Sequence, residues 1–517
     1  MEKWQEGLLL AYKSLQSNVA IAITEDFERI QQVAKMFSEK ERDMPYYVWD
    51  VNLNIVWDAD GRNVTDKFPL TPPDLLEYVR THKILLIISY IYSQQLADSI
   101  TPLLVSMSMD DKVFSRRSFI VVFTNSTENF PKPLLRMSII VDIPPSTQEE
   151  RKNKLYAIAA EASSAGIKIE ITSALIQAGA GLNLKEIETV ALKSLATRKT
   201  IDVEEFSNYK TQLLKSMGLE LIQPRTTFNH IGGYTKLKQY IRQRFVKVLK
   251  NPEIAERYGL SLPKGLILYG LPGTGKTVFS LALAHEVGLP MVKLTPDKLF
   301  HGIVGESEKA VRNIAKTIEA MAPVIVFVDE ADQLFINRSQ INTMTDSGVT
   351  SRVVGGLLEW LGDPERKAFV IAATNYVDRI DPALMRPGRM DEVIPIYPPD
   401  AEARLQILKI HTEVVRRVPL SADLEEVVRA TDLFTGAEIE KVVLDAASMA
   451  MMEDKPVVTT DDLLQAVNST GFDRTLREQR IREMTQVLSK LENVNRSLIT
   501  QLTQTSDSRL KQLISNL

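Results

Sequence analysis

The stretch Gly270-Leu-Pro-Gly-Thr-Gly-Lys-Thr277 decides the fold of this chain. An apolar run, 265–269, precedes it directly, and a helical pattern, 278–286, follows it directly. A strand that turns through glycines into a helix directs unpaired backbone N–H groups and the positive helix end toward one point, which suits a polyphosphate. In such a loop Lys276 reaches the outer phosphates, and the hydroxyl of Thr277 holds Mg²⁺. The stretch therefore predicts a nucleotide-binding α/β domain with a parallel sheet.

A second part of the predicted site lies about 50 residues further on, a spacing typical of neighbouring strands in one parallel sheet. The continuous apolar run 323–328 is typical of a strand buried on both faces, and it ends in Asp329 and Glu330. An acid at such a strand end completes the shell of a Mg²⁺ ion. The next acid is placed to orient and deprotonate an attacking water. We therefore expect Asp329 to hold the metal and Glu330 to serve as the general base of nucleotide hydrolysis.

Two further elements supply groups for the same reaction. The apolar strand 369–373 ends in Thr374 and Asn375, and we expect the amide of Asn375 to polarise the water near the γ-phosphate. The Pro- and Gly-rich segment that follows carries Arg386 and Arg389. An arginine that touches the γ-phosphate stabilises the charge of the transition state. The alternative is that both are ordinary surface arginines in a loop.

Taken together, the motifs from residue 226 to residue 471 resemble the AAA ATPase family. The resemblance implies a P-loop α/β subdomain at 226–400 and a helical lid at 401–475. It implies ATP and Mg²⁺ as cofactors. In this family, arginines placed like Arg386 and Arg389 enter the site of the adjacent subunit of a ring. The resemblance therefore implies a homo-oligomer, a ring of six subunits, that acts on an unidentified protein substrate or partner.

Several other segments match the ones that contact the nucleotide in AAA proteins. Ile231-Gly-Gly233 resembles the entry turn beside adenine, Ile410-His-Thr412 the segment whose histidine lies beside the ribose and adenine, and Gly436-Ala-Glu-Ile439 the start of the lid helix. The predicted nucleotide-binding residues are Ile231, Gly232, Pro272, Gly273, Thr274, Gly275, Lys276, Thr277, Val278, His411, Gly436 and Ala437.

The segment before Gly305-Glu-Ser-Glu308 matches the one that lines the central pore of AAA translocases. Its key position, usually aromatic in such proteins, is Ile303 here, with Val304 beside it and Phe300 three residues earlier. An isoleucine offers a threaded polypeptide less contact area than an aromatic ring. Two interpretations stay open: the loop grips a substrate chain, or it packs within the ring and touches no substrate.

The first 222 residues repeat features of the rear half without its chemistry. The segment Phe119–Asn125 parallels Phe369–Asn375, and Ile139–Pro145 parallels Val393–Pro399. Recurring segments of this kind predict a degenerate AAA-like α/β domain over 1–222, the alternative being an unrelated α/β domain. After its first strand the chain reads Thr24-Glu-Asp-Phe-Glu28, whose acids repel a phosphate. This arrangement resembles the AAA proteins first described as an uncharacterised chloroplast reading frame and also found in cyanobacteria.

The tail, 476–517, is predicted to form an amphipathic helix. Apolar residues recur at heptad-like positions from Ile481 to Leu502, and Asn495 falls in the same seam. About three heptads is the lower limit for a coiled coil, and a lone seam asparagine fixes register in such bundles. The two hypotheses are self-association through this helix and a terminal helix that lies on the ring surface.

Composition narrows the remaining classes of function. The chain has 517 residues, of which 44% are apolar and 25% charged, and it has no cysteine. The lack of cysteine excludes disulfides, zinc thiolate sites and thiol nucleophiles. The net charge of −4 argues against a general affinity for nucleic acid. We expect a cytoplasmic protein, because the most apolar run, 84–92, is far shorter than the roughly 20 residues of a membrane helix.

Three functions are consistent with these features. The leading one is an oligomeric Mg²⁺-dependent ATPase that remodels a protein or a complex. The second is a nucleotide-gated regulator that recruits partners without threading them. The third, nucleic-acid remodelling, is least favoured because the basic residues are interspersed with acids.

Overall fold

The computed structural model describes residues 2–14, 17–24, 26, 28–41, 43–69, 71–91, 93–164, 166–217, 219–296, 307–336, 349–496, 498–499 and 508–514. No helix in these ranges is long and apolar enough to cross a membrane. The chain divides into two compact units, Met1–Tyr209 and Lys210–Leu517, called here the front unit and the rear unit. This division falls before the predicted boundary near residue 222. The reason is that strand β7 (Glu220–Ile222) pairs with β9 (Met291–Leu294) of the rear unit.

The rear unit is built on a six-stranded sheet with the order β12-β8-β11-β10-β9-β7. Its other strands are β8 (Gly265–Gly270), β10 (Ile325–Val328), β11 (Phe369–Thr374) and β12 (Glu392–Ile396). All neighbours are parallel except β7 against β9. The three predicted strands are confirmed, and every residue of β8, β10 and β11 is buried, as their continuous apolar sequences require. The carboxyl ends of these three central strands therefore meet at one edge of the sheet.

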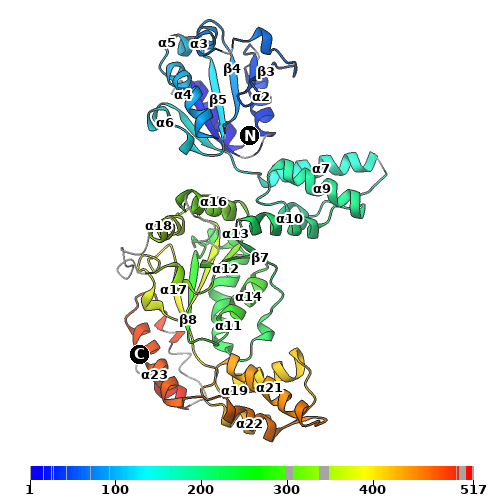
Figure 1. The fold of residues 1–517 in the computed structure, drawn as a ribbon, viewed down its shortest axis with the longest axis vertical. Helices are drawn as coiled ribbons and strands as arrows, with labels where there is room; N and C mark the ends of the chain where they lie inside the picture. Colours follow the sequence, from blue (N-terminus) through cyan, green and yellow to red (C-terminus); the bar gives the residue numbers. More distant parts are fainter. Residues whose placement is uncertain are drawn as a thin grey trace. The chain divides into compact units, whose positions relative to one another are not determined.

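Helices cover both faces of this sheet (Figure 1). Alternate residues of β8 face opposite sides: Leu266 and Leu268 lie in one apolar core, and Ile267 and Tyr269 lie in the other. The first core includes α11 (Thr235–Ile241), the π-helical turn Arg242–Val246 and α14 (Lys276–Val287). The second includes α16 (Ser307–Ala320), α17 (Ala331–Leu334) and α18 (Val349–Leu361). The short helices α12 (Lys247–Lys250) and α13 (Pro252–Arg257) precede β8.

The predicted lid forms a helical layer with its own apolar core. Its helices are α19 (Ala401–Lys409), continued by a π-helical turn at Ile410–Val415, α20 (Leu424–Ala430), α21 (Gly436–Met452) and α22 (Thr460–Ser469). Two short strands, β13 (Leu420–Ser421) and β14 (Val458–Thr459), pair beside them. Buried residues from α19 to α22, such as Leu408, Val442 and Leu463, make up this core.

The front unit contains a second six-stranded sheet, with the order β3-β2-β4-β5-β1-β6. Its strands are β1 (Val19–Ile23), β2 (Tyr46–Asp50), β3 (Ile55–Trp57), β4 (Leu85–Ile91), β5 (Phe119–Thr124) and β6 (Ile139–Asp142). When β1 is matched with β8, β2 with β9, β4 with β10, β5 with β11 and β6 with β12, the five parallel strands of the two sheets have the same order. The edge strands differ in connectivity, because β3 follows β2 in the chain and β7 precedes β8. In both sheets the antiparallel strand lies at the edge, as β3 against β2 and β7 against β9. The degenerate AAA-like topology predicted for the front half is thus present.

Helices complete the same plan in the front unit. They are α1 (Lys3–Ser14), α2 (Glu28–Lys40), α3 (Pro72–Thr81), α4 (Gln94–Ser108), α5 (Asp111–Arg116), α6 (Lys132–Met137), α7 (Gln148–Ser164), α8 (Ser173–Ala178) and α9 (Leu184–Arg198). The division between the units falls within α10 (Val203–Ser216). Buried Arg151 in α7 donates to the carbonyl five residues before it and to one in α8. Buried Arg404 in α19 donates to the carbonyl five residues before it and to one in α20. This shared anchor supports the match of α7 with α19 at the level of single hydrogen bonds.

The coiled-coil hypothesis for the tail is wrong within the residues that the structure describes. Helix α23 (Arg474–Ser489) ends before Asn495, and its apolar residues Ile481, Met484 and Leu488 are buried in the core of the rear unit. After the helix, the N–H of Val393 in β12 donates to the carbonyl of Asn493 at 3.0 Å. The short helix α25 (Ser508–Ile514) contributes to the same core. The apolar stripe therefore packs within its own chain. The sequence could not predict this, because helical periodicity does not specify whether the partner of an apolar face is another copy or the same domain.

We expect the replacement Leu488→Ala to destabilise the rear unit by about 2–5 kcal/mol, the usual cost of truncating a buried leucine. Leu488 is 1% exposed. The matched control is Leu476→Ala on the same helix, where the side chain is 44% exposed and the expected change is within about 0.5 kcal/mol. Urea unfolding of the full chain measures both. An unchanged midpoint for Leu488→Ala, together with dissociation of an oligomer, would restore the coiled coil.

Candidate functional site

The phosphate loop lies between β8 and α14, where the sequence places it. Gly273 and Gly275 have φ of +79° and +86°, values that favour glycine, so the loop turns sharply into the helix. Gly273 also lies against the start of α21, because its carbonyl accepts a hydrogen bond from Ala437 N at 3.1 Å. A Cβ on Gly273 would lie only 2.8 Å from Thr435 Oγ1. The lid helix therefore borders the loop directly.

Lys276 begins α14 and points back into the loop. It is 9% exposed and donates to the carbonyls of Gly270 at 3.0 Å and Leu271 at 2.9 Å. Its third donor bonds Asn375 Oδ1 at 2.7 Å. The predicted phosphate-binding lysine and the predicted water-positioning amide are thus in direct contact. Burial lowers the pKa of Lys276 to about 8.

This pKa gives a pH dependence for nucleotide binding. As pH rises through about 8, the free protein loses the Lys276 proton that the phosphates attract, so we expect ATP affinity to fall by about tenfold per pH unit above 8. Calorimetric titration with a non-hydrolysable ATP analogue between pH 7 and 9.5 measures the slope. The control is Lys276→Arg. Its guanidinium stays charged throughout this range, so the fall of ATP affinity above pH 8 should be absent. Equal slopes in the two proteins would assign the pH dependence to another group.

The predicted metal ligands lie at the next strand end. Thr277 Oγ1 is 3.5 Å from Asp329 Oδ2, so a hydroxyl and a carboxylate oxygen converge beside the phosphate loop. Such hard oxygen donors, with phosphate oxygens and water, are the ligands that Mg²⁺ takes in nucleotide sites. The residues present therefore fit the ion. Lys293 of β9, which was not predicted as a site residue, also lies close, with its Nζ 3.5 Å from Asp329 Oδ2. Its only signal in the sequence is a single charge within the strand Met291–Leu294.

Glu330 has an unusual backbone conformation for a side chain of its size. Its φ is +51°, in the left-handed region that non-glycine residues rarely adopt. Its carboxylate is exposed and accepts a hydrogen bond from Gln333 Nε2 at 2.8 Å. Strained residues of this kind concentrate at functional sites, where the fold holds them in place. Here the conformation presents the carboxylate next to Asp329 and toward the pocket that both residues line.

Asn375 is held in place from the neighbouring loop. The preceding Thr374 is 1% exposed, and its hydroxyl donates to Asp332 Oδ1 at 2.6 Å. The N–H of Tyr376 donates to the same hydroxyl at 2.9 Å. These bonds tie the end of β11 to the segment that follows Asp329, which fixes the amide relative to the acids.

The end of the site that is predicted to hold the adenine is formed by the entry turn and the lid. A Cβ on Gly232 would lie 2.6 Å from Ile407 Cγ1, so glycine is required where this turn meets α19. His411 lies beside Glu440 of α21, with Nδ1 3.9 Å from the carboxylate Oε1. Burial lowers the pKa of His411 below its usual value, which keeps the ring neutral at pH 7.

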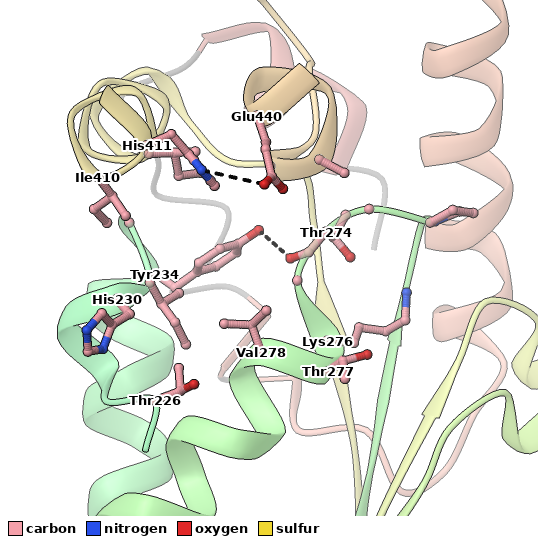
Figure 2. A pocket seen from close by; sticks show the side chains of 18 of the residues that line it. Thr226, His230, Tyr234, Thr274, Lys276, Thr277, Val278, Ile410, His411 and Glu440 are labelled. Carbon is pink, nitrogen blue, oxygen red and sulfur yellow. Dashed lines mark hydrogen bonds and ion pairs between the residues drawn. The ribbon is translucent and has the colours of Figure 1, made fainter. Parts of the chain in front are cut away.

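These groups line one pocket of about 660 Å³, within the range typical of nucleotide-sized ligands. All twelve predicted nucleotide-binding residues border it, together with Asp329, Glu330 and Asn375. Figure 2 shows Lys276 and Thr277 at one end and His411 and Glu440 at the other. The pocket also includes Ile410, from the predicted segment Ile410-His-Thr412, and residues that were not predicted from the sequence, namely Arg225, Thr226, His230, Tyr234, Ile407, Val415 and Glu440.

Tyr234, one of the residues not predicted, is held in place by hydrogen bonds of its hydroxyl. Its hydroxyl donates to the carbonyl of Tyr397 at 2.8 Å and is 3.4 Å from the carbonyl of Thr274. Burial raises the pKa of Tyr234, so the hydroxyl keeps its proton as a donor. The sequence signal was its position directly after Gly232 and Gly233.

Arg386 and Arg389 do not border the pocket of their own chain. Arg386 is exposed. Arg389 is half-buried, and its Nη1 donates to the carbonyl of Ala383 at 2.8 Å. The predicted pore residues Phe300, Ile303 and Val304 lie outside the described residues.

Comparison with known proteins agrees with this geometry. The model of the "ATPase family associated with various cellular activities (AAA)" matches residues 266–397, and that of the AAA+ lid domain matches 421–465. The chain is 32% identical over 446 residues to the "Uncharacterized AAA domain-containing protein ycf46" of Guillardia theta, covering 85% of this chain and 86% of that protein.

Other similar proteins differ in how much of this chain they cover. The chain is 38% identical over 267 residues to the "Proteasome-activating nucleotidase" of Pyrococcus abyssi (strain GE5 / Orsay), covering 51% of this chain and 67% of that protein. A ycf46 protein of Trieres chinensis is 28% identical over 473 residues, covering 90% of this chain and 92% of that protein. The chain therefore belongs to the AAA family of ATPases, and the phosphate loop, acidic strand end and lid of its rear unit are those of an ATP-hydrolysing module.

Proposed function

We propose that this chain hydrolyses ATP with Mg²⁺ in a ring of six copies and that the ring remodels a protein or a protein complex. The observation that carries the proposal is the separation of Arg386 and Arg389 from the pocket of their own chain. A loose transition state of phosphoryl transfer needs cationic stabilisation near the γ-phosphate. Lys276 and Arg225 line the pocket, but Arg386 and Arg389, the arginines predicted to reach the γ-phosphate, do not. We therefore assign the contribution of Arg386 and Arg389 to the site of a neighbouring copy.

Each predicted residue has one role in this reaction. Lys276 and the loop N–H groups hold the phosphates, and Thr277 and Asp329 hold the metal. When bound, Mg²⁺ neutralises charge on the phosphate oxygens. Glu330 takes a proton from the attacking water, and Asn375 orients that water. Arg386 and Arg389 of the adjacent copy stabilise the charge that develops on the γ-phosphate.

The action on a protein is supported by relatives rather than by the site. The proteasome-activating nucleotidases carry, in their name, an action on a protein machine, and their similarity spans half of this chain. Membership of the AAA family supports the oligomeric form, because AAA proteins typically act as oligomers. The alternative is a regulator that uses the same ATPase cycle but threads no polypeptide through the ring. The two functions differ in whether the predicted pore residues contact a substrate chain.

The dependence of activity on protein concentration tests the ring. With Mg²⁺ and a non-hydrolysable ATP analogue, we expect electron microscopy to show six-membered rings. We also expect ATP turnover per chain to fall steeply when the protein is diluted below its assembly concentration. Constant turnover per chain from a species with the mass of a single chain would overturn the proposal.

A further inference from the structure

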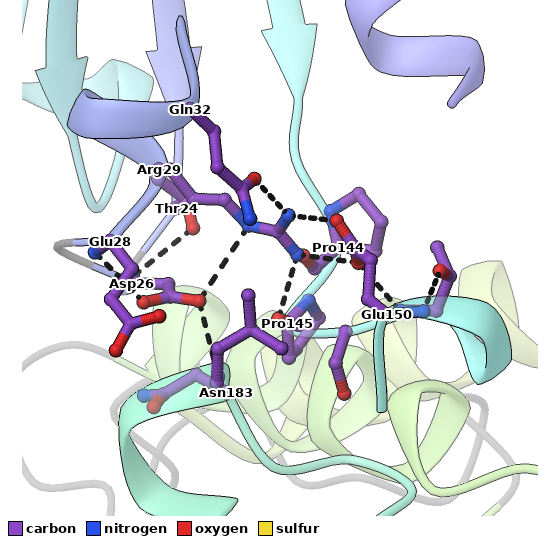
Figure 3. Close-up of polar contacts among 12 residues, drawn as sticks. Thr24, Asp26, Glu28, Arg29, Gln32, Pro144, Pro145, Glu150 and Asn183 are labelled. Atoms are coloured by element: carbon purple, nitrogen blue, oxygen red, sulfur yellow. Dashed lines mark hydrogen bonds and ion pairs between the residues drawn. The ribbon is translucent and has the colours of Figure 1, made fainter. Parts of the chain in front are cut away.

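The front unit has a buried ion-pair cluster where the rear unit has its phosphate loop. The strand match places the connection between β1 and α2 at the counterpart of the connection between β8 and α14. The side chains of Asp26 and Arg29 in this connection and in the first turn of α2 are both 0% exposed. Figure 3 shows them facing residues from the start of α7 and α9.

The carboxylate of Asp26 accepts hydrogen bonds from the N–H groups at the start of two helices. Its Oδ1 accepts from the N–H of Glu28, the first residue of α2, at 3.1 Å. Its Oδ2 accepts from the N–H of Leu184, the first residue of α9, at 3.2 Å. The counterparts of these helices in the rear unit, α14 and α21, both border the nucleotide pocket. A carboxylate at helix N-termini satisfies the donors that hold a phosphate in nucleotide sites.

Arg29 lies in the first turn of α2, as Lys276 lies in the first turn of α14. Its Nε is 3.6 Å from Asp26 Oδ2, and its Nη2 donates to Glu150 Oε2 at 3.0 Å. Nη2 also donates to the carbonyls of Pro144 and Pro145, each at 2.9 Å. Glu150 belongs to α7, and the two prolines lie in the segment between β6 and that helix. The guanidinium thus ties the sheet layer to the helical layer of the front unit.

A second set of ion pairs strengthens the same connection. Lys154 of α7 lies 3.1 Å from Glu28 of α2 and 3.3 Å from Glu188 of α9. Lys185 of α9 also lies 3.1 Å from Glu188. The charged groups at this position are therefore paired with one another, which leaves no free cation in these contacts to attract a triphosphate.

We propose that Asp26 and Arg29 are a built-in substitute for bound nucleotide, with the Asp26 carboxylate in place of a phosphate and Arg29 in place of the phosphate-binding lysine. The substitute holds α7 and α9 against the front sheet in one arrangement, whether ATP is present or not. Each chain accordingly binds one nucleotide, in the rear unit. The front unit is a constant scaffold, and conformational response to ATP is confined to the rear unit.

Amide hydrogen exchange on the full chain tests the first half of this proposal. Saturating ATP analogue is expected to protect rear-unit peptides around 270–280 and 436–440 and to leave front-unit peptides around 24–32, 144–151 and 184–190 unchanged. In the Lys276→Ala chain, we expect no saturable binding of the analogue by equilibrium dialysis. Two analogues bound per wild-type chain, or analogue-dependent protection of the front-unit peptides, would overturn it.

Substitution of the cluster tests the second half. We expect Arg29→Met to speed exchange in α7 and α9 by at least about tenfold, because it leaves buried carboxylates without their cation. Analogue binding by the rear unit should stay within twofold. The matched control is Arg62→Met in the same unit, where the side chain is 75% exposed and no change is expected.

A milder variant keeps the test valid if Arg29→Met does not fold. Glu150→Gln removes one charge but retains an oxygen acceptor, so we expect a smaller increase of exchange confined to α7 and the residues before it. If Glu150→Gln and a folded Arg29→Met both exchange like the wild type, the cluster does not hold the helices, and the proposal fails.

Discussion

The Glu330→Gln chain is expected to bind ATP as tightly as the wild type and to hydrolyse it about 10²–10⁴ times more slowly. The amide keeps the size and hydrogen-bonding capacity of the side chain but cannot accept the proton of the attacking water. Binding depends on other groups of the pocket, namely Lys276 and the loop N–H groups, which this replacement leaves unchanged. Calorimetric titration gives the affinity, and phosphate release under saturating ATP gives the turnover.

The control for this variant is Glu359→Gln, an exposed glutamate on α18 of the same unit. It changes charge by the same amount and should leave turnover unaltered. If Glu330→Gln turns over ATP at the wild-type rate, the general base lies elsewhere. Because Glu330 keeps a left-handed φ of +51°, its thermal stability should be compared as well. A large loss of stability would indicate that the residue mainly supports the loop.

The second large effect is expected for the arginines, with Arg389→Ala and Arg386→Ala each lowering turnover by about 10³–10⁵ while ATP affinity changes by no more than a few-fold. The separation of the two effects follows from the structure, since neither arginine borders the pocket of its own chain. The control is Arg429→Ala, an exposed arginine of α20. Turnover and affinity are measured in the same way as for Glu330→Gln.

Mixed assemblies show whether the arginine acts on a neighbour. A Lys276→Ala chain lacks a working pocket but keeps its arginines, and an Arg389→Ala chain has the opposite defect. If the arginine acts across the interface, co-expression of the two should recover turnover well above that of either alone. If the mixture is as inactive as its components although mixed rings form, the assignment of Arg389 to the adjacent site is wrong.

Much of the nucleotide pocket was predictable because its chemistry is local in sequence. The loop from Gly270 to Thr277 and the acids Asp329 and Glu330 each follow a buried strand, and parallel strands end at one edge of the sheet. The apolar runs identified those strands, so the meeting point of their ends followed. Residues such as Lys293 and Tyr234 were not predictable in this way, because their contacts with Asp329 and Tyr397 join elements far apart in the chain.

The amino-acid sequence by itself determined the two-sheet plan, the phosphate loop and the lack of such a loop in the front half. These depend on short patterns of apolar residues, glycines and charges. Only the tertiary structure decided the fate of the tail and of Asp26 and Arg29. An apolar helical stripe packs equally well on another chain or on its own domain, and α23 packs on its own. The sequence predicts only that the acids after β1 repel a phosphate. In the structure, Arg29 links Asp26 to Glu150, which lies 121 residues from Arg29 in the chain. That contact exists only in the folded chain, which brings the two segments together.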